Sequence, residues 1–187
     1  IFARLVLNLK RPTVGLLNVG SEEQKGHEEL REASAILRQI DLPMEFIGFV
    51  EGDDITAGTV DVIVTDGFSG NIALKAAEGT SRMFTFFLKE AFGSSIYSKI
   101  GYVFSKTAIN QVRERMDPRK YNGAVFLGLN GIAVKSHGST DSFGFANAIG
   151  VAADMSKYGF LDKVKDELRI LHAEGEASEK LRSTGDA

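Results

Sequence analysis

The sequence contains no cysteine, which excludes disulfide bonds, thiolate metal sites and a cysteine nucleophile. Its three histidines, His27, His137 and His172, lie far apart along the chain and lack the spacing of a zinc site. No apolar run approaches the length that is needed to span a membrane. The formal net charge of −3 argues against general nucleic-acid binding, which requires a basic surface. We therefore expect a cytoplasmic, metal-free protein that does not bind nucleic acid.

The composition is that of an ordinary globular protein, with 43% hydrophobic and 25% charged residues in a chain of 187. A chain of this length can bury one good-sized core. It opens on IFARLVL, an amphipathic helical pattern without a starting Met, so we expect the later part of a longer protein. We predict a single α/β domain over residues 1–173, followed by a polar and flexible segment at 174–187.

Strand and helix patterns alternate over the first third of the chain. Short apolar runs at residues 13–17, 44–50 and 60–64 predict buried strands. Between the first two, an amphipathic pattern predicts a helix that reaches Ile40 and has Ser21 as its N-cap. This alternation is typical of a doubly wound, mostly parallel sheet. Later in the chain we expect strands within 123–131 and 132–135 and helices at 143–155 and 160–171.

Residues 80–120 predict a helical hairpin that is inserted into the α/β domain and divided at Gly93-Ser94-Ser95. From Arg82 to Lys120, eight basic residues stand against three acidic ones, and the apolar stripe is wider than one packed face needs. One interpretation is a subunit interface, and another is a surface for an acyl chain, an acidic protein or anionic lipid. Both can occur on one hairpin. The residues we assign to this surface are Phe84, Phe87, Phe92, Lys89 and Lys99.

The first candidate loop, TDGFSGN at Thr65–Asn71, follows an apolar strand and precedes a helical pattern. It therefore lies at the carboxyl end of a strand, the edge where α/β sheets usually bind ligands. Gly67 and Gly70 let the backbone approach a ligand, and unpaired helix amides can hold an anion. A glycine-containing turn capped by an asparagine, here Asn71, is also common without any ligand.

The second candidate loop, SHGSTDS at Ser136–Ser142, again follows a strand and precedes a helix. Its small and polar residues can turn the chain, offer hydroxyls and cap the helix: Gly138, Ser139, Thr140, Asp141 and Ser142. Lys135 adds a cation, and His137 is the natural proton carrier near neutral pH. A histidine in a turn and an aspartate at a helix start are also ordinary structural features. Two such loops bordering one crevice would suit a doubly charged oxyanion such as phosphate.

Together with RPTVGLLN at Arg11–Asn18, these motifs resemble the phosphate acyltransferases of bacterial phospholipid synthesis, the PlsX family, over about residues 1–160. The resemblance implies transfer of a long acyl group from acyl carrier protein to inorganic phosphate, without a cofactor. It also implies a fold like that of isocitrate/isopropylmalate dehydrogenases and phosphotransacetylases, with a protruding hairpin that forms a homodimer. Peripheral contact with the inner face of the membrane and a glycerol-3-phosphate acyltransferase partner are further expectations. Family members have an N-terminal half that is absent here.

Phosphotransacetylases have a Gly-Asn-x-x-x-Lys turn and a Ser-Arg-Gly turn, which resemble Gly70-Asn71 with Lys75 and, with His for Arg, Ser136-His137-Gly138. Our mechanistic hypothesis is that a phosphate oxygen attacks the acyl thioester directly, with no acyl-enzyme, which the absence of cysteine permits. Asn71 would donate to the developing oxyanion, and either His137 or Asp141 would orient or deprotonate phosphate and return a proton to the thiol. The residues that would hold phosphate are Asp66, Gly67, Gly70, Lys75, Lys135, Gly138, Ser139 and Thr140.

Two alternatives remain open. A phosphotransacetylase that uses coenzyme A would have the same chemistry with another thioester. A non-catalytic membrane-docking or scaffold protein would rest on the hairpin alone. A nicotinamide dehydrogenase of related fold is disfavoured, because no Gly-x-Gly-x-x-Gly follows a strand.

Overall fold

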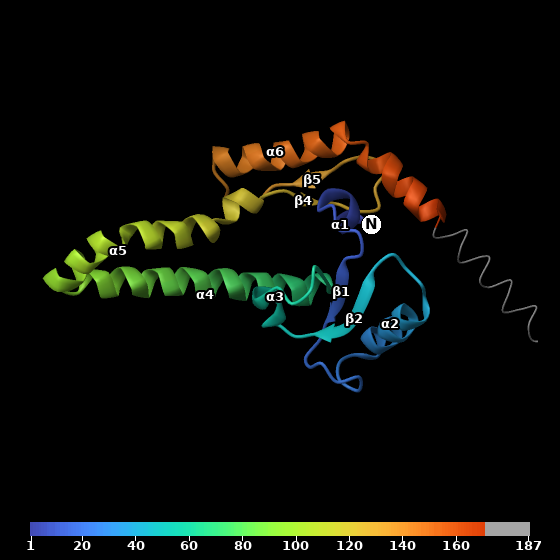
Figure 1. Ribbon diagram of the computed structural model, residues 1–187, viewed down its shortest axis with the longest axis horizontal. Coiled ribbons are helices and arrows are strands. Elements are labelled where there is room, and N and C mark those ends of the chain that lie inside the picture. Colours follow the sequence, from blue (N-terminus) through green and yellow to red (C-terminus); the bar gives the residue numbers. More distant parts are fainter. Residues whose placement is uncertain (171–187) are drawn as a thin grey trace, which may run out of the picture. The chain divides into compact units, whose positions relative to one another are not determined.

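The computed structural model describes residues 1–170, which divide into two compact units built from separate segments of the chain (Figure 1). The first unit comprises Ile1–Thr65, Ala124–Lys135 and the described residues from Ile149 to Ile170. The second comprises Asp66–Gly123 and Ser136–Ala148. The expected flexible segment at 174–187 lies outside the described residues.

A three-stranded parallel sheet in the order β2-β1-β3 forms the centre of the first unit. Its elements, in chain order, are β1 (Thr13–Leu17), α2 (Glu28–Gln39), β2 (Glu45–Val50), the short α3 (Asp54–Ala57) and β3 (Val62–Val64). The apolar, β-branched runs form these strands because their side chains fill a core, in which Leu16 and Val50 are 4% and 3% exposed. The expected α/β class and parallel sheet are confirmed.

The sheet requires glycine at two places. A Cβ on Gly15 would lie 2.6 Å from Val50 Cγ1, so β1 and β2 can approach each other only with glycine there. The register shifts by one residue opposite this point, which leaves Ile47 as an extra residue in β2. Gly48 absorbs the distortion with a φ of 107°, a conformation that other residues rarely adopt.

Asp61 connects the start of β3 to the start of β1. Its carboxylate accepts hydrogen bonds from the backbone N–H and from Oγ1 of Thr13, both at 2.8 Å. The backbone N–H of Asp61 in turn donates to Thr13 Oγ1 at 2.8 Å. The bonds from Thr13 hold the pKa of Asp61 below its ordinary value, because they favour the charged carboxylate.

The helix α2 begins at Glu28, so the prediction that Ser21 caps it is wrong. Asn18 explains the difference, because hydrogen bonds of its side chain hold the loop between β1 and α2. Its Nδ2 donates to the carbonyl of Lys25 at 3.0 Å, and its Oδ1 accepts from the N–H of Val19 at 2.9 Å. Gly26 has a φ of 87°, and a side chain there would collide with Asn18. The chain is thereby kept out of helical geometry until His27.

The first unit also contains α1 (Phe2–Val6), the antiparallel pair β4 (Ala124–Val125) and β5 (Val134–Lys135), and helical residues at 160–170. Phe2 packs edge-on against Phe160, with ring centroids 5.9 Å apart. Arg4 Nη1 donates to Glu167 Oε2 at 2.5 Å. These two contacts join the first helix of the chain to its last described helical segment.

The second unit consists mainly of two long helices, α4 (Gly67–Gly93) and α5 (Ile96–Arg115), which lie antiparallel in Figure 1. The break falls at Ser94 and Ser95, as predicted, and Ser95 Oγ accepts from the N–H of Ser98 to cap α5. The 3₁₀ helix η1 (Pro118–Tyr121) and the start of α6 (Ser142–Lys157) complete the unit. No helix within residues 1–170 is long and apolar enough to cross a membrane.

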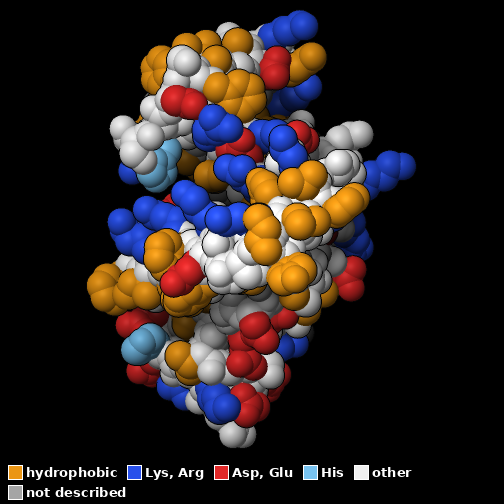
Figure 2. All heavy atoms as spheres, turned by 90° about the vertical axis from the view of Figure 1, so that its left-hand side faces the viewer, with side chains coloured by type: hydrophobic (Ala, Val, Ile, Leu, Met, Phe, Trp, Pro, Cys, Tyr) orange, Lys and Arg blue, Asp and Glu red, His pale blue; other side chains and the backbone are white. Residues whose placement is uncertain are grey.

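No residue of α4 or α5 is buried within the described chain. Large apolar side chains stay exposed along both helices, among them Phe84, Phe86, Phe87, Val103 and Phe104. Figure 2, which looks onto the end of this helix pair, shows hydrophobic and basic side chains next to one another. An apolar surface of this kind on a protein usually contacts a partner or a membrane.

Candidate functional site

The second candidate loop lines a hollow of about 500 Å³ in the second unit. The lining residues are Ser136, His137, Gly138, Thr140, Asp141, Ser142 and Phe145. All except Phe145 belong to the loop that the sequence singles out. Within residues 1–170, no three His, Asp or Glu side chains are placed to hold a metal ion.

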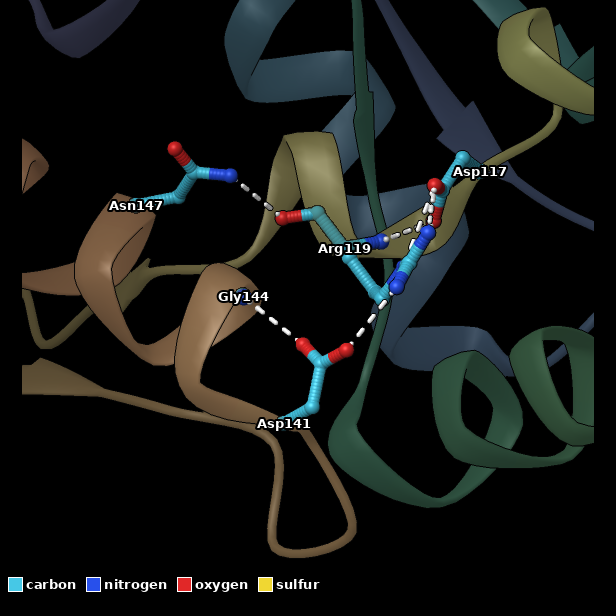
Figure 3. Close-up of polar contacts among 5 residues, drawn as sticks. All are labelled: Asp117, Arg119, Asp141, Gly144 and Asn147. Carbon is cyan, nitrogen blue, oxygen red and sulfur yellow. Dashed lines mark hydrogen bonds and ion pairs between the residues drawn. The ribbon is translucent and has the colours of Figure 1, made fainter.

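Asp141 caps α6 and is held by two partners (Figure 3). Its Oδ1 accepts from the N–H of Gly144 at 3.0 Å, and its Oδ2 accepts from Arg119 Nη1 at 2.8 Å. The Gly144 bond first, and the Arg119 guanidinium second, hold the pKa of Asp141 below its ordinary value. A carboxylate with both oxygens engaged and a lowered pKa is a weak base.

Arg119 is a site residue that sequence reasoning missed. It binds Asp117 through Nε and through Nη2, the latter at 2.6 Å, and these bonds lower the pKa of Asp117 to about 2. Its carbonyl accepts from Asn147 Nδ2 at 2.9 Å, and its guanidinium lies 5.5 Å from the ring centroid of Phe143. Arg119 thus connects η1 to the first turns of α6. The one signal near this position in the sequence was the Asp-Pro pair directly before Arg119, which is typical of a turn.

Asn122, also missed, connects both ends of the loop from a position that is 9% exposed. Its Nδ2 donates to Ser136 Oγ at 2.8 Å and to the carbonyl of Gly144 at 2.7 Å. Its Oδ1 accepts from the N–H of His137 at 2.9 Å. Both amide hydrogens and one oxygen lone pair of the side chain are therefore used. No local pattern in the sequence distinguishes this asparagine from one in an ordinary turn.

His137 is oriented from its Nδ1 side by Ser139. The Ser139 N–H donates to Nδ1 at 3.3 Å, and Ser139 Oγ lies 3.0 Å from the same atom. Because Nδ1 accepts the backbone N–H, the ring proton is assigned to Nε2. Nε2 lies 4.0 Å from Glu78 Oε1. The N–H of Thr140 donates to the His137 carbonyl at 3.2 Å, so the amides of Ser139 and Thr140, which we expected to face an anion, both have partners within the loop.

In the first candidate loop, Asp66 is the N-cap of α4, so the expectation that Asn71 is the cap is wrong. Asp66 Oδ1 accepts from the N–H groups of Phe68 and Ser69 at 2.8 and 2.9 Å. Bonds from Ser69 and Phe68 hold the pKa of Asp66 below its ordinary value. The N–H of Gly70 donates to the Asp66 carbonyl at 3.0 Å. A phosphate at this helix end would have to replace a carboxylate, whereas the space beside Gly67 is open.

One face of α4 carries a polar stripe of Asn71, Lys75, Glu78 and Arg82. Their spacings of four, three and four residues place them above one another on the helix. Because Glu78 faces His137, the second loop lies over the same helix face as Asn71 and Lys75. Asn71 precedes Glu78 by about 10 Å along the axis. The structure therefore groups the second-loop residues with Glu78 and sets Asn71 two turns away, while Lys135 belongs to the first unit.

A parallel α/β unit and a capped loop that carries a histidine define an α/β protein with a candidate acid–base site. The sequence model of the fatty acid synthesis protein family matches residues 1–163, and the chain belongs to this family.

The chain is similar to curated proteins named phosphate acyltransferase, which confirms the resemblance seen in the motifs. It is 57% identical over 185 residues to that of Paramagnetospirillum magneticum, covering 98% of this chain and 53% of the relative. The identity is 61% over 178 residues for Rhodospirillum centenum, with 95% and 50% covered. It is 58% over 172 residues for Agrobacterium fabrum, with 91% and 49% covered. The chain spans about half the length of the curated relatives it matches.

Proposed function

We propose that this chain forms part of an acyltransferase that moves a long-chain acyl group from acyl carrier protein to inorganic phosphate. The product is an acyl phosphate for phospholipid synthesis. Family membership carries the proposal, together with 57–61% identity to proteins named phosphate acyltransferase over at least 91% of the chain. The parallel order β2-β1-β3 supports a doubly wound fold like that of phosphotransacetylases and isopropylmalate dehydrogenases.

The reaction moves one proton in two transfers and needs no cofactor. An oxygen of hydrogen phosphate attacks the thioester carbonyl carbon, the carbon–sulfur bond breaks, and the phosphate proton ends on the departing sulfur. His137 moves this proton, because its ring borders the hollow and its Nδ1 carries the lone pair; Nδ1 accepts the Ser139 N–H at 3.3 Å and must exchange that bond for the phosphate proton. Asp141, which is held as an ion by Gly144 and Arg119, positions the loop instead.

Phosphate binding in this proposal depends on cations and on the remaining loop groups. Asp66 and Asp141 place carboxylates at the starts of both helices, and these repel a phosphate dianion. Lys75 balances that charge, while Gly138, Ser139 and Thr140 supply polar groups. Asn71, one turn before Lys75, donates to the oxyanion. Gly67 keeps the backbone accessible, since nothing lies within 4 Å of a Cβ placed there.

The site is tested by measuring acyl-phosphate formation from acyl-acyl carrier protein and phosphate. The assay uses the full-length protein, with any residues that precede this chain. We expect Asn71→Ala and His137→Ala to lower kcat/KM by about 100-fold or more, in line with single oxyanion donors and general bases. Wild-type rates in both variants would contradict the assignment. Equal rates with acyl-coenzyme A would favour the phosphotransacetylase alternative.

The α4–α5 pair supports a second part of the proposal, a homodimer formed through these helices. Phe84 and Phe87 are 58% and 55% exposed, whereas Phe92 packs against Tyr102 with ring centroids 5.4 Å apart. We assign Lys89 and Lys99 to the acidic carrier protein or to anionic lipid. A glycerol-3-phosphate acyltransferase would then receive the product at the membrane surface. Light scattering of Phe84→Asp tests whether these helices form the dimer. Vesicle sedimentation of Lys89→Glu tests peripheral membrane binding separately.

A further inference from the structure

Glu78 is the one carboxylate that lies within 4.0 Å of a His137 ring nitrogen among the residues the structure describes. The two residues come from different segments of the second unit, α4 and the loop before α6. Both side chains are partly exposed, at 43% for Glu78 and 61% for His137. Sequence reasoning assigned no role to Glu78, because its position on α4 is that of an ordinary surface glutamate.

The carboxylate of Glu78 is itself oriented by Arg82, one turn later on α4. Arg82 Nη2 donates to Glu78 Oε2 at 3.1 Å, and Arg82 Nε donates to the Glu78 carbonyl at 3.4 Å. This pairing at i,i+4 engages one carboxylate oxygen and directs the other, Oε1, towards the imidazole. The ion pair thus leaves Oε1 as the Glu78 oxygen beside the imidazole.

The imidazole of His137 is complementary to this carboxylate. Ser139 engages Nδ1 through its N–H at 3.3 Å, so the ring proton lies on Nε2, the nitrogen that faces Glu78. A separation of 4.0 Å is an ion-pair distance, and closing it by about 1 Å would form a hydrogen bond. When His137 takes up a proton at Nδ1, the ring becomes a cation beside the carboxylate.

We propose that Glu78 is a positioning residue for His137, a role that rests on the function proposed above. It keeps the ring proton on Nε2, so that Nδ1, once it exchanges the Ser139 N–H for substrate, receives the proton of hydrogen phosphate. It then stabilises the imidazolium until that proton passes to the departing sulfur. The carboxylate is not protonated in this cycle, as in other carboxylate–imidazole pairs of acid–base sites.

The test compares three variants of the full-length protein in the acyl-phosphate assay. Glu78→Gln removes the charge and keeps the shape, and we expect kcat to fall about 10- to 100-fold with little change in the KM for phosphate. Arg82→Gln removes the helix ion pair but leaves Glu78 beside His137, so we expect a smaller loss. Glu90→Gln, an exposed glutamate later on α4, is the matched control and should behave as wild type.

A double substitution separates this role from a structural one. With His137→Ala already present, adding Glu78→Gln should cause no further loss, because Glu78 acts through the imidazole. If the double variant instead loses activity by the product of the two single losses, the proposal is overturned. It is also overturned if Glu78→Gln and Arg82→Gln lose the same activity and the same melting temperature. Wild-type activity in Glu78→Gln would overturn it while leaving the proposed function intact. An unmodified protein that forms no acyl phosphate would instead overturn the proposed function.

Discussion

Arg119 and Asp141 are 22 residues apart in the sequence, and Arg119 Nη1 donates to Asp141 Oδ2 at 2.8 Å. The same guanidinium holds Asp117, so one cation lies between two carboxylates at the start of α6 (Figure 3). The arrangement keeps both aspartates charged well below neutral pH. It leaves His137 as the loop's remaining candidate for moving a proton.

Acid should remove the contribution of Asp117 to stability. Its pKa falls from 3.8 to about 2 on folding, so the contribution is complete above the unfolded value and is lost as the pH decreases towards about 2. We expect Asp117→Asn to lower the melting temperature at pH 7 and to lower it much less near pH 2. Asp162→Asn, at an exposed aspartate in the helical residues 160–170, is the control. An equal effect of Asp117→Asn at both pH values would contradict this.

Asn122→Ala should destabilise the second unit by about 1–3 kcal/mol, because the Gly144 carbonyl and the His137 N–H lose their buried partner. Urea unfolding measures the change. Asn110→Ala, at an exposed position on α5, should be close to neutral. If both variants unfold at the same urea concentration, the side-chain bonds of Asn122 contribute nothing measurable.

Two glycines of α6 should respond to alanine in opposite ways. A Cβ on Gly144 would collide with Thr140 Oγ1 and lie 3.3 Å from Arg119 Cβ, so Gly144→Ala should be destabilising. Nothing lies within 4 Å of a Cβ on Gly150, so Gly150→Ala should stabilise the helix by about 0.5–1 kcal/mol. Thermal unfolding of the two variants side by side makes the comparison. A stabilised Gly144→Ala would show that Thr140 is free to move.

Asp66→Asn should improve phosphate binding if the anion docks at the start of α4. Asparagine is as good an N-cap as aspartate, but it carries no charge to repel phosphate. We expect a lower KM for phosphate in Asp66→Asn, whereas Asp66→Ala should also lose the cap and melt earlier. An increased KM in Asp66→Asn would instead show that this carboxylate helps to hold the substrate.

Local patterns predicted the elements of this fold better than their connections. The run Thr13–Leu17 forms a strand with the predicted bounds, because apolar, β-branched residues suit a buried parallel sheet. The delayed start of α2 was not predictable from helical periodicity, since the buried side chain of Asn18 decides it. The sequence could have predicted Asp66 as the N-cap of α4, because aspartate caps helices as well as asparagine does and Asp66 directly precedes the helix.

The candidate site shows the same division. Its loop, Ser136–Ser142, was identified from residue types alone, since a glycine, hydroxyls and a histidine between strand and helix are informative. Its partners were not, because Glu78 and Arg119 reach the loop from 59 and 18 residues before His137. No periodicity records contacts of that range. They depend on how the helices pack.

The second unit is assembled from two stretches, Asp66–Gly123 and Ser136–Ala148, with β4 and β5 between them in the chain. Excising the first stretch as a free peptide would leave Asn122 without any of its three side-chain bonds, and Arg119 with one carboxylate in place of two. Such a peptide would also lack His137 and the rest of the loop that borders the hollow. Any transplant of this candidate site to another scaffold must therefore carry both stretches together.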